Sequence, residues 1–209
     1  MPNHCSNHVY LPAGENAHKV LEPYLYSCED DGSTCLDFNK VVPMPPELLA
    51  ETTQYSTDKA ENERIRKSNL AKFGFRDWYD WRLANWDTKW NAYWGYVADD
   101  HLQFSTAWSS PTKVVAQLAK LLKKPLRLTY VDEAHLFFGE TFFDKDGEVI
   151  EDNCYGDVSE CPRELAEELG VVDEEMDENV EDDKALRSEA EAILMKDETY
   201  KNLMKGMQK

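Results

Sequence analysis

The sequence lacks an uninterrupted apolar run of the roughly 20 residues that a membrane-spanning helix requires. Its first ten residues, MPNHCSNHVY, lack the basic and apolar stretches of a secretory signal. Basic residues are scarce, with 23 Lys and Arg against 41 Asp and Glu, so the formal net charge is −18. This charge argues against binding nucleic-acid phosphates or anionic membranes. We therefore expect a cytoplasmic protein with no direct nucleic-acid or membrane contact, whose partner carries a basic surface.

Motifs that mark catalytic or metal sites are also few. There is no GxSxG motif, and nine glycines leave little room for a Gly-rich phosphate loop. The five cysteines are odd in number and accompany no secretion signal, so reduced thiols are expected. None of their spacings is the CxxC of a zinc ribbon or thioredoxin site. His4, Cys5 and His8 could contribute to a zinc site, and residues 144–147 resemble part of a calcium loop. Residues 99–101 (Asp-Asp-His) could bind a metal or act as acid and base. Semi-buried thiols, solvated imidazoles and simple turns explain the same residues, so we expect no enzyme, no metal and no cofactor.

Hydrophobic periodicity over residues 1–150 predicts an α+β domain with a helical insertion at about residues 45–95. We expect strands at 8–11, 36–42, 102–108, 126–130 and 136–138, and a hairpin of 141–143 with 148–150. Helices are expected at 16–26, 58–72 and 111–122. Two βαβ halves forming an antiparallel sheet with helices on one face correspond to the ferredoxin-like split-βαβ plan.

Two of these elements have a predicted buried face. In the strand at 102–108, alternation places Leu102, Phe104, Thr106 and Trp108 on one face. In the helix at 111–122, spacings of three and four predict burial of the following residues: Val114, Val115, Leu118, Leu121 and Leu122.

Residues 151–209 form an acidic appendage. They carry 19 acids and 7 bases, a net of −12, whereas residues 1–150 carry 22 acids and 16 bases, a net of −6. We expect a helix between Pro162 and Gly170 and a second one from about Asp183. Closely spaced carboxylates can imitate the phosphates of a nucleic acid and occupy a basic groove. The other interpretation is a solvated acidic surface that keeps the protein soluble.

Aromatic residues are concentrated in one block, where ten of the 24 residues from Phe73 to Tyr96 are Phe, Tyr or Trp. The block can be a helix whose rings cover the sheet, with the indole N–H groups bonded to backbone. It can also be a protein-interaction surface, or a stacking platform for bases or a cationic ligand.

Five motifs together resemble a known family: MPNHCSN at residues 1–7, LDFNKVVPMP at 36–45, WDTKWNAY at 86–93, FSTAWSSP at 104–111 and YVDEA at 130–134. They resemble the YubB-type ferredoxin-like family of phage, prophage and conjugative-plasmid proteins, which includes the Api-like phage proteins. The resemblance covers residues 1–150, with His4 where the family usually has Trp and Asp87 where it usually has Gly. It implies a ferredoxin-like domain, a mobile-element origin and action in a bacterial cytoplasm. It implies no established enzyme activity.

The leading hypothesis is therefore a non-enzymatic inhibitor that binds a host defence protein by charge and shape. Its predicted partner-binding residues are seven tail carboxylates and three aromatic anchors: Glu167, Glu168, Asp173, Glu174, Glu175, Asp177, Glu178, Trp78, Trp81 and Trp86. The alternative is a small-ligand or nucleotide-binding module with these residues near a pocket: Asn39, Lys40, Lys89 and Ser105. Hydrolysis of a signalling nucleotide ranks last.

Overall fold

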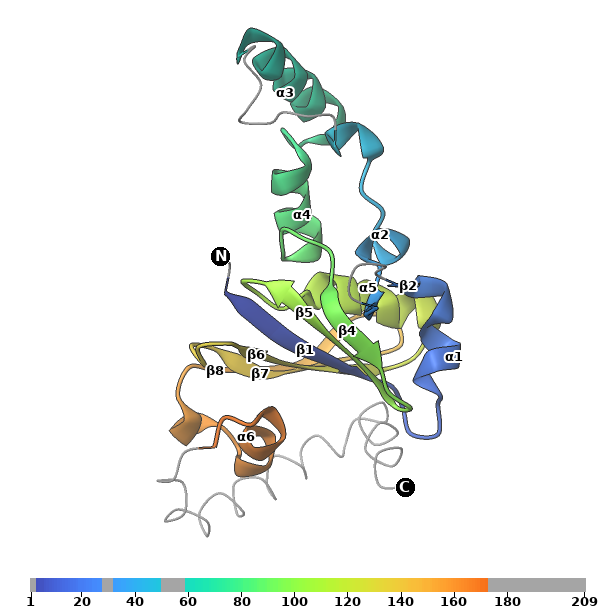
Figure 1. The fold of residues 1–209 in the computed structure, drawn as a ribbon, viewed down its shortest axis with the longest axis vertical. Helices are drawn as coiled ribbons and strands as arrows, with labels where there is room; N and C mark the ends of the chain where they lie inside the picture. The colour runs from blue at the N-terminus through green and yellow to red at the C-terminus, as the bar shows by residue number, and fades with distance from the viewer. Residues whose placement is uncertain (1–2, 28–31, 50–58, 173–209) are drawn as a thin grey trace.

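The computed structural model describes residues 3–27, 32–49 and 59–172 (Figure 1). Six strands form an antiparallel sheet in the order β4-β5-β1-β6-β7-β8. Their bounds are β1 (His4–Tyr10), β4 (Tyr93–Val97), β5 (His101–Ala107), β6 (Leu126–Asp132), β7 (Phe138–Phe143) and β8 (Val149–Tyr155). The chain runs from β1 through helices to the β4–β5 pair, then through α5 (Thr112–Leu122) to β6. This βαββαβ connectivity, with β1 and β5 central, confirms the ferredoxin-like α+β fold.

The β7–β8 hairpin extends this four-stranded unit beyond β6. The turn at 144–147 closes as expected, because the Asp144 side chain accepts hydrogen bonds from the backbone N–H groups of Asp146 and Glu148. The separate strand predicted at 136–138 is wrong, since residues 133–136 form a turn and β7 begins at Phe138. The boundary expected after residue 150 falls inside β8.

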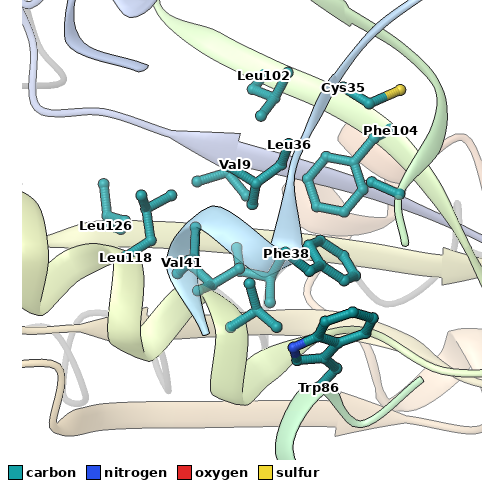
Figure 2. Packing of buried hydrophobic residues seen from close by; sticks show 14 of the residues in the cluster. Val9, Cys35, Leu36, Phe38, Val41, Trp86, Leu102, Phe104, Leu118 and Leu126 are labelled. Carbon is teal, nitrogen blue, oxygen red and sulfur yellow. The ribbon is translucent and has the colours of Figure 1, made fainter. Parts of the chain in front are cut away.

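One face of the sheet, the closed face, is covered by helices and carries the main core. On β1 this face carries Val9, which pairs with Leu102 of β5 and Leu128 of β6. Helix α5 packs Leu118 and its apolar neighbours Val114 and Val115 into this layer, as its periodicity predicts. Figure 2 shows the core side chains of α2 (Phe38–Val41), α4 (Trp78–Trp86) and α5 meeting those of β1, β5 and β6. Two α5 residues differ from the prediction, because Leu121 is 41% exposed and Leu122 only partly buried.

The segment between β1 and β4 departs from two predictions. It contains α1 (Ala17–Leu21), a 3-10 turn (Glu22–Tyr24), β2 (Leu25–Ser27), β3 (Thr34–Leu36), α2 (Phe38–Val41), a 3-10 turn (Pro46–Leu49), α3 (Lys59–Phe73) and α4 (Trp78–Trp86). The helix predicted at 16–26 stops at Leu21, because Pro23 has no N–H to continue it. The strand predicted at 36–42 stops at Leu36, because the Asp37 side chain caps α2 by accepting from the backbone N–H of Asn39.

Helices α3 and α4 form an arm that projects away from the sheet (Figure 1). The helix predicted at 58–72 is confirmed as α3, which is polar around its circumference and buries only Asn69. The aromatic block is divided: its first part forms α4 and its last part forms β4, an edge strand that the periodicity did not reveal. Within the described part of the chain, the helices are too short or too polar to span a bilayer.

The opposite face of the sheet, the open face, is covered by α6 (Arg163–Leu169) over its β6–β8 part (Figure 1). The helix expected between Pro162 and Gly170 is confirmed, and Gly170 ends it at a positive φ of 68°. Leu165 and Ala166 pack on Phe138 in a second apolar cluster. The second tail helix, expected from about Asp183, lies outside the described residues.

We predict that Leu118→Ala lowers the free energy of unfolding by about 2–5 kcal/mol, because it leaves a cavity between α5 and the sheet. Leu121→Ala, three residues along the same helix, should change it by less than about 1 kcal/mol, because that side chain is already largely solvated. Urea unfolding of the two variants and the wild type measures the difference. Equal losses would contradict the assignment of the core to the Leu118 side of α5.

Candidate functional site

Four large aromatic side chains are exposed along β4 and the segments beside it. Trp90, Trp94, Tyr96 and Trp108, here called the aromatic surface, are 40%, 59%, 53% and 42% exposed. Scattered exposed apolar residues need no explanation, but several large rings on one edge of a sheet mark a contact surface. Trp and Tyr are also the residue types that most often supply the energy of protein interfaces.

The position of Trp94 depends on an irregularity in β4. The register between β4 and β5 shifts between Tyr93 and Tyr96, and Trp94 lies at a positive φ of 51°. Neighbouring side chains of a regular strand point to opposite faces. Here the rings of Tyr93 and Trp94 both contact His4, at centroid distances of 5.7 and 4.8 Å. The bulge therefore directs two consecutive aromatic rings to the open face.

The outer side of β4 is occupied by β3. The backbone N–H of Gly95 lies 3.1 Å from Cys35 Sγ, and a Cβ at Gly95 would be 2.7 Å from the carbonyl oxygen of Gln103 and 2.9 Å from that sulfur. Only glycine permits this close approach. A partner would consequently meet the rings of the aromatic surface rather than the backbone edge of β4.

The prediction that Trp108 shares the buried face of Leu102 and Phe104 is wrong, because Trp108 is exposed. Strand β5 ends at Ala107, and Trp108 takes a positive φ of 74°, which turns its side chain outward. Its backbone N–H still donates to the carbonyl oxygen of Asn3 at 3.0 Å. A non-glycine residue in this conformation is strained and persists only where its surroundings hold it.

Lys89 links two rings of the aromatic surface. Its Nζ lies 4.1 Å from the centroid of Trp90 and 3.7 Å from that of Trp108. Both distances are well within the range of a cation–π contact. We call Lys89, Trp90 and Trp108 the lysine cage.

The backbone of the lysine cage is clamped to the end of β5 and the start of α5. Buried Thr88 donates from Oγ1 to the carbonyl oxygen of Ala107 at 2.8 Å. The Ser109 hydroxyl donates to the carbonyl oxygen of Asp87. Asp87 Oδ2 accepts from the backbone N–H of Lys113 at 2.9 Å, and Oδ1 pairs with Lys113 Nζ at 2.7 Å. Asp87 has a φ of 63°, so it occupies a left-handed position that favours glycine.

The predicted aromatic anchors Trp81 and Trp86 are buried, with exposures of 7% and 0%. The indole N–H of Trp86 donates to the carbonyl oxygen of Val42 at 2.9 Å. Trp78 is partly buried, and the guanidinium of Arg82 lies between its ring and that of Trp86, at 5.0 and 4.8 Å. Burial lowers the pKa of Arg82. These three tryptophans therefore agree with the prediction that the block packs in the core. Trp90 and Trp94 agree instead with the prediction of an interaction surface.

Of the seven predicted tail carboxylates, the two that are described form ion pairs within the chain. Glu168 accepts two hydrogen bonds from Arg127, at 3.0 and 2.7 Å, and Arg127 also donates to Glu140 at 2.8 Å. Glu167 pairs with Arg163 at 2.8 Å on the exposed side of α6. The other five lie outside the described residues: Asp173, Glu174, Glu175, Asp177 and Glu178.

The ion pairs of Arg127 with Glu140 and Glu168 are surrounded by polar residues of the open face. The sequence did not predict that these residues lie together. The rings of His8 and His101 stack at 5.5 Å, and His8 Nδ1 lies 3.3 Å from the Tyr10 hydroxyl. The guanidinium of Arg127 lies over the Tyr10 ring at 5.3 Å. Burial, followed by the neighbouring charge of His101, lowers the pKa of His8. Alternation along β1 could have placed His8 and Tyr10 on one face, but the register with β5 and β6 decides what they meet.

The four residues of the alternative ligand site do not converge. Exposed Asn39 and Lys40 lie on α2, whose Phe38 packs on the closed face. Ser105 lies on the open face, because it alternates with buried Phe104 and pairs with Ser6. Lys89 is held in the lysine cage.

The metal candidates do not form sites in the described part of the chain, where no cluster of three potential ligands occurs. Cys5 lies on the closed face and its two histidine neighbours on the open face. Burial, followed by the charge of Asp132, raises the pKa of Cys5 to about 12, so the thiol stays protonated. Asp99 and Asp100 form the turn between β4 and β5, and His101 begins β5, where its carbonyl oxygen accepts from the backbone N–H of Ala98.

One family model supports the fold. It is described as the ferredoxin-like domain in Api92-like protein and matches residues 89–182, a range that begins in the lysine cage and extends past α6. A solved structure, that of a protein api92 from Yersinia pseudotuberculosis, aligns over 75% of this chain and 99% of that chain. Its sequence identity is 8% and its TM-score 0.36. No curated protein matches the chain.

We predict that Glu168→Gln lowers the free energy of unfolding by about 1–3 kcal/mol. The glutamine would offer Arg127 one uncharged oxygen in place of the two charged oxygens of Glu168, while the bond from Arg127 to Glu140 stays. Glu167→Gln, on the neighbouring residue, should change it by less than about 0.5 kcal/mol, because its ion pair is exposed. Urea unfolding compares the two. A larger loss for Glu167→Gln would refute the role of Glu168 in holding α6 on the sheet.

We also predict that His8 contributes to acid sensitivity. Because its pKa in the folded protein lies below the ordinary value of 6.5, the unfolded chain binds the proton more readily. This contribution to stability is complete above about pH 7 and declines as the pH falls through 6.5 toward the folded pKa. His8→Gln should therefore lose less stability than the wild type between about pH 7.5 and 5.5 in thermal unfolding. The same change at exposed His18 controls for the loss of an imidazole, and identical pH responses of His8→Gln and wild type would contradict the prediction.

Proposed function

We propose that this chain is a non-enzymatic binding protein that docks its aromatic surface on a host protein with a basic surface and blocks it. The observation that carries the proposal is the exposure of Trp90, Trp94, Tyr96 and Trp108 along one edge of the sheet. Burying such rings against a partner removes apolar area from water and supplies interface energy. The resemblance to phage and plasmid proteins supports a host defence protein as the partner.

Backbone strain at the aromatic surface supports the same function. Trp94 and Trp108 both occupy the left-handed region, which disfavours large side chains. Glycine, which has no Cβ, would meet the demands of the fold with less strain. Strain of this kind concentrates where a side chain must be presented in a defined direction, and a contact with another molecule is such a requirement.

The charge distribution supports a basic partner. Residues 144–168, which form the β7–β8 turn, β8 and α6, contain ten Asp or Glu and two Lys or Arg. Several of these carboxylates are exposed on β8, the outer strand at the opposite end of the sheet from β4, and in the segments just before and after it: Glu148, Asp152, Asp157 and Glu160, here called the acidic edge. A surface of one charge sign accelerates association with an oppositely charged partner and makes it sensitive to salt.

The ion pairs of α6 change which carboxylates could imitate the phosphates of a nucleic acid. Glu167 and Glu168 neutralise Arg163 and Arg127 within the chain, so they offer little charge to a partner. The acidic edge carries that role among the described residues. We assign steering to the acidic edge and contact energy to the aromatic surface, because exposed charges change association rates more than affinity.

The proposal is tested by capture from bacterial lysate on the immobilised full chain at low and high salt, with identification of the eluted protein. We expect Trp94→Ala, combined with Tyr96→Ala, to reduce capture at least about tenfold, which is typical of losing an interface anchor. Leu136→Ala is the matched control, because Leu136 is 67% exposed in the turn before β7, outside the aromatic surface.

Replacing Glu148 and Glu160, whose side chains are exposed, by Lys should slow association and weaken its dependence on salt, without altering the folded state. Surface plasmon resonance with the captured protein measures the rate at several salt concentrations. Capture that is equal for wild type, the Trp94 and Tyr96 variant and the Leu136 control would refute the proposal.

A further inference from the structure

We propose that Trp90 and Trp108 are the walls of a cation-binding site that accepts a lysine, arginine or methylated ammonium group from another molecule in exchange for Lys89. The two rings already hold an ammonium, at centroid distances of 4.1 and 3.7 Å, and both remain about two-fifths exposed. The negative faces of aromatic rings attract cations, and sites that recognise quaternary ammonium groups are built from such rings.

Lys89 is held only weakly in this position. Among the described residues, its ammonium pairs with no carboxylate, and it lies over the two rings. Lys113 and Lys124, by contrast, each reach a carboxylate, on Asp87 and Glu15. A lysine stem has four rotatable bonds, so the ammonium can leave for water without moving the backbone. A cation brought in by an interface that contacts the surrounding surface can therefore take its place.

The walls themselves are fixed before any ligand binds. Thr88, Asp87 and Ser109 clamp the two backbone segments that carry the rings, and Arg82 donates from Nη1 to the carbonyl oxygen of Lys89 at 3.3 Å. A preformed site loses less conformational entropy on binding than one that must be ordered.

Arg82 makes a cation–π contact of the same kind that stabilises the fold. Its guanidinium lies against Trp78, which is partly buried, and Trp86, which is fully buried, so one ring of this pair is closed to solvent. In the lysine cage both rings are exposed, so an external cation can reach either of them.

The cation affinity of the cage is independent of the proposed function, whereas its use for a partner's side chain rests on that function. The net charge of −18 favours a basic partner, whose lysine and arginine side chains are the cations most available to the site. Because the cage lies beside the exposed rings of β4, one partner can contact both.

The test titrates choline and its neutral carbon analogue, 3,3-dimethylbutan-1-ol, into the full chain, observed through the indole N–H signals in nitrogen–proton correlation spectra. In Lys89→Ala, which empties the cage, choline should shift the signals of Trp90 and Trp108, and the neutral analogue should not. Wild type should bind choline about fivefold more weakly, because Lys89 competes. In the double variant Lys89→Ala and Trp108→Leu, choline should no longer shift the Trp90 signal. The other indole signals should stay in place, which shows that the variant is folded. Equal responses to choline and the neutral analogue, or none in Lys89→Ala, would overturn the cation site.

The partner arm uses the protein captured in the lysate experiment. Lys89→Ala should bind it more tightly than wild type does, and Trp108→Leu more weakly. If choline binds but both variants bind the partner as wild type does, the cage is a cation site that the partner does not use, and this part of the proposal is refuted. If choline does not bind and capture of the partner still depends on Trp94, the cation site is refuted and the proposed function is not.

Discussion

The packing of α5 across the central strands is the interaction on which the remaining structure depends. Leu118 and its neighbours meet Val9, Leu102 and Leu128, which occupy one face of β1, β5 and β6. A sheet residue cannot face both sides, so this packing fixes which side chains of each strand point to the open face. A register slip of one residue would exchange His8 and Tyr10 with the core.

The open face shows how one sheet meets two different requirements. Over β6–β8, α6 covers it with apolar contacts and with the ion pairs of Arg127, a side chain that is only 10% exposed. A buried guanidinium is costly unless its donors are paired, which explains why both Glu140 and Glu168 converge on it. Over β4 and β5, rings at the surface remain exposed, and they supply the proposed binding function. Stabilising α6 and presenting Trp94 and Tyr96 therefore use separate halves of one face.

Cation–π contacts recur in this molecule with different consequences. Arg82 between Trp78 and Trp86 holds α4 to the core, and Lys89 between Trp90 and Trp108 lies at the surface. The hydrogen bond from Arg82 to the backbone of Lys89 connects them. The contacts are chemically alike and both cations are partly buried. The burial of the rings differs, since Trp86 is enclosed whereas Trp90 and Trp108 can be reached by a cation from solvent.

The sequence alone determined the fold class, α5 and α6, because helical periodicity, proline at a helix start and glycine at its end are local signals. It also determined the acidic charge and the aromatic block. The tertiary structure decided which members of those sets are available. Glu167 and Glu168 are adjacent, yet one lies on solvent and the other on Arg127; Trp86 and Trp90 are four residues apart, yet one is core and the other surface. These distinctions depend on a left-handed residue at Asp87, a bulge in β4 and contacts between distant segments, none of which leaves a periodic pattern in the sequence.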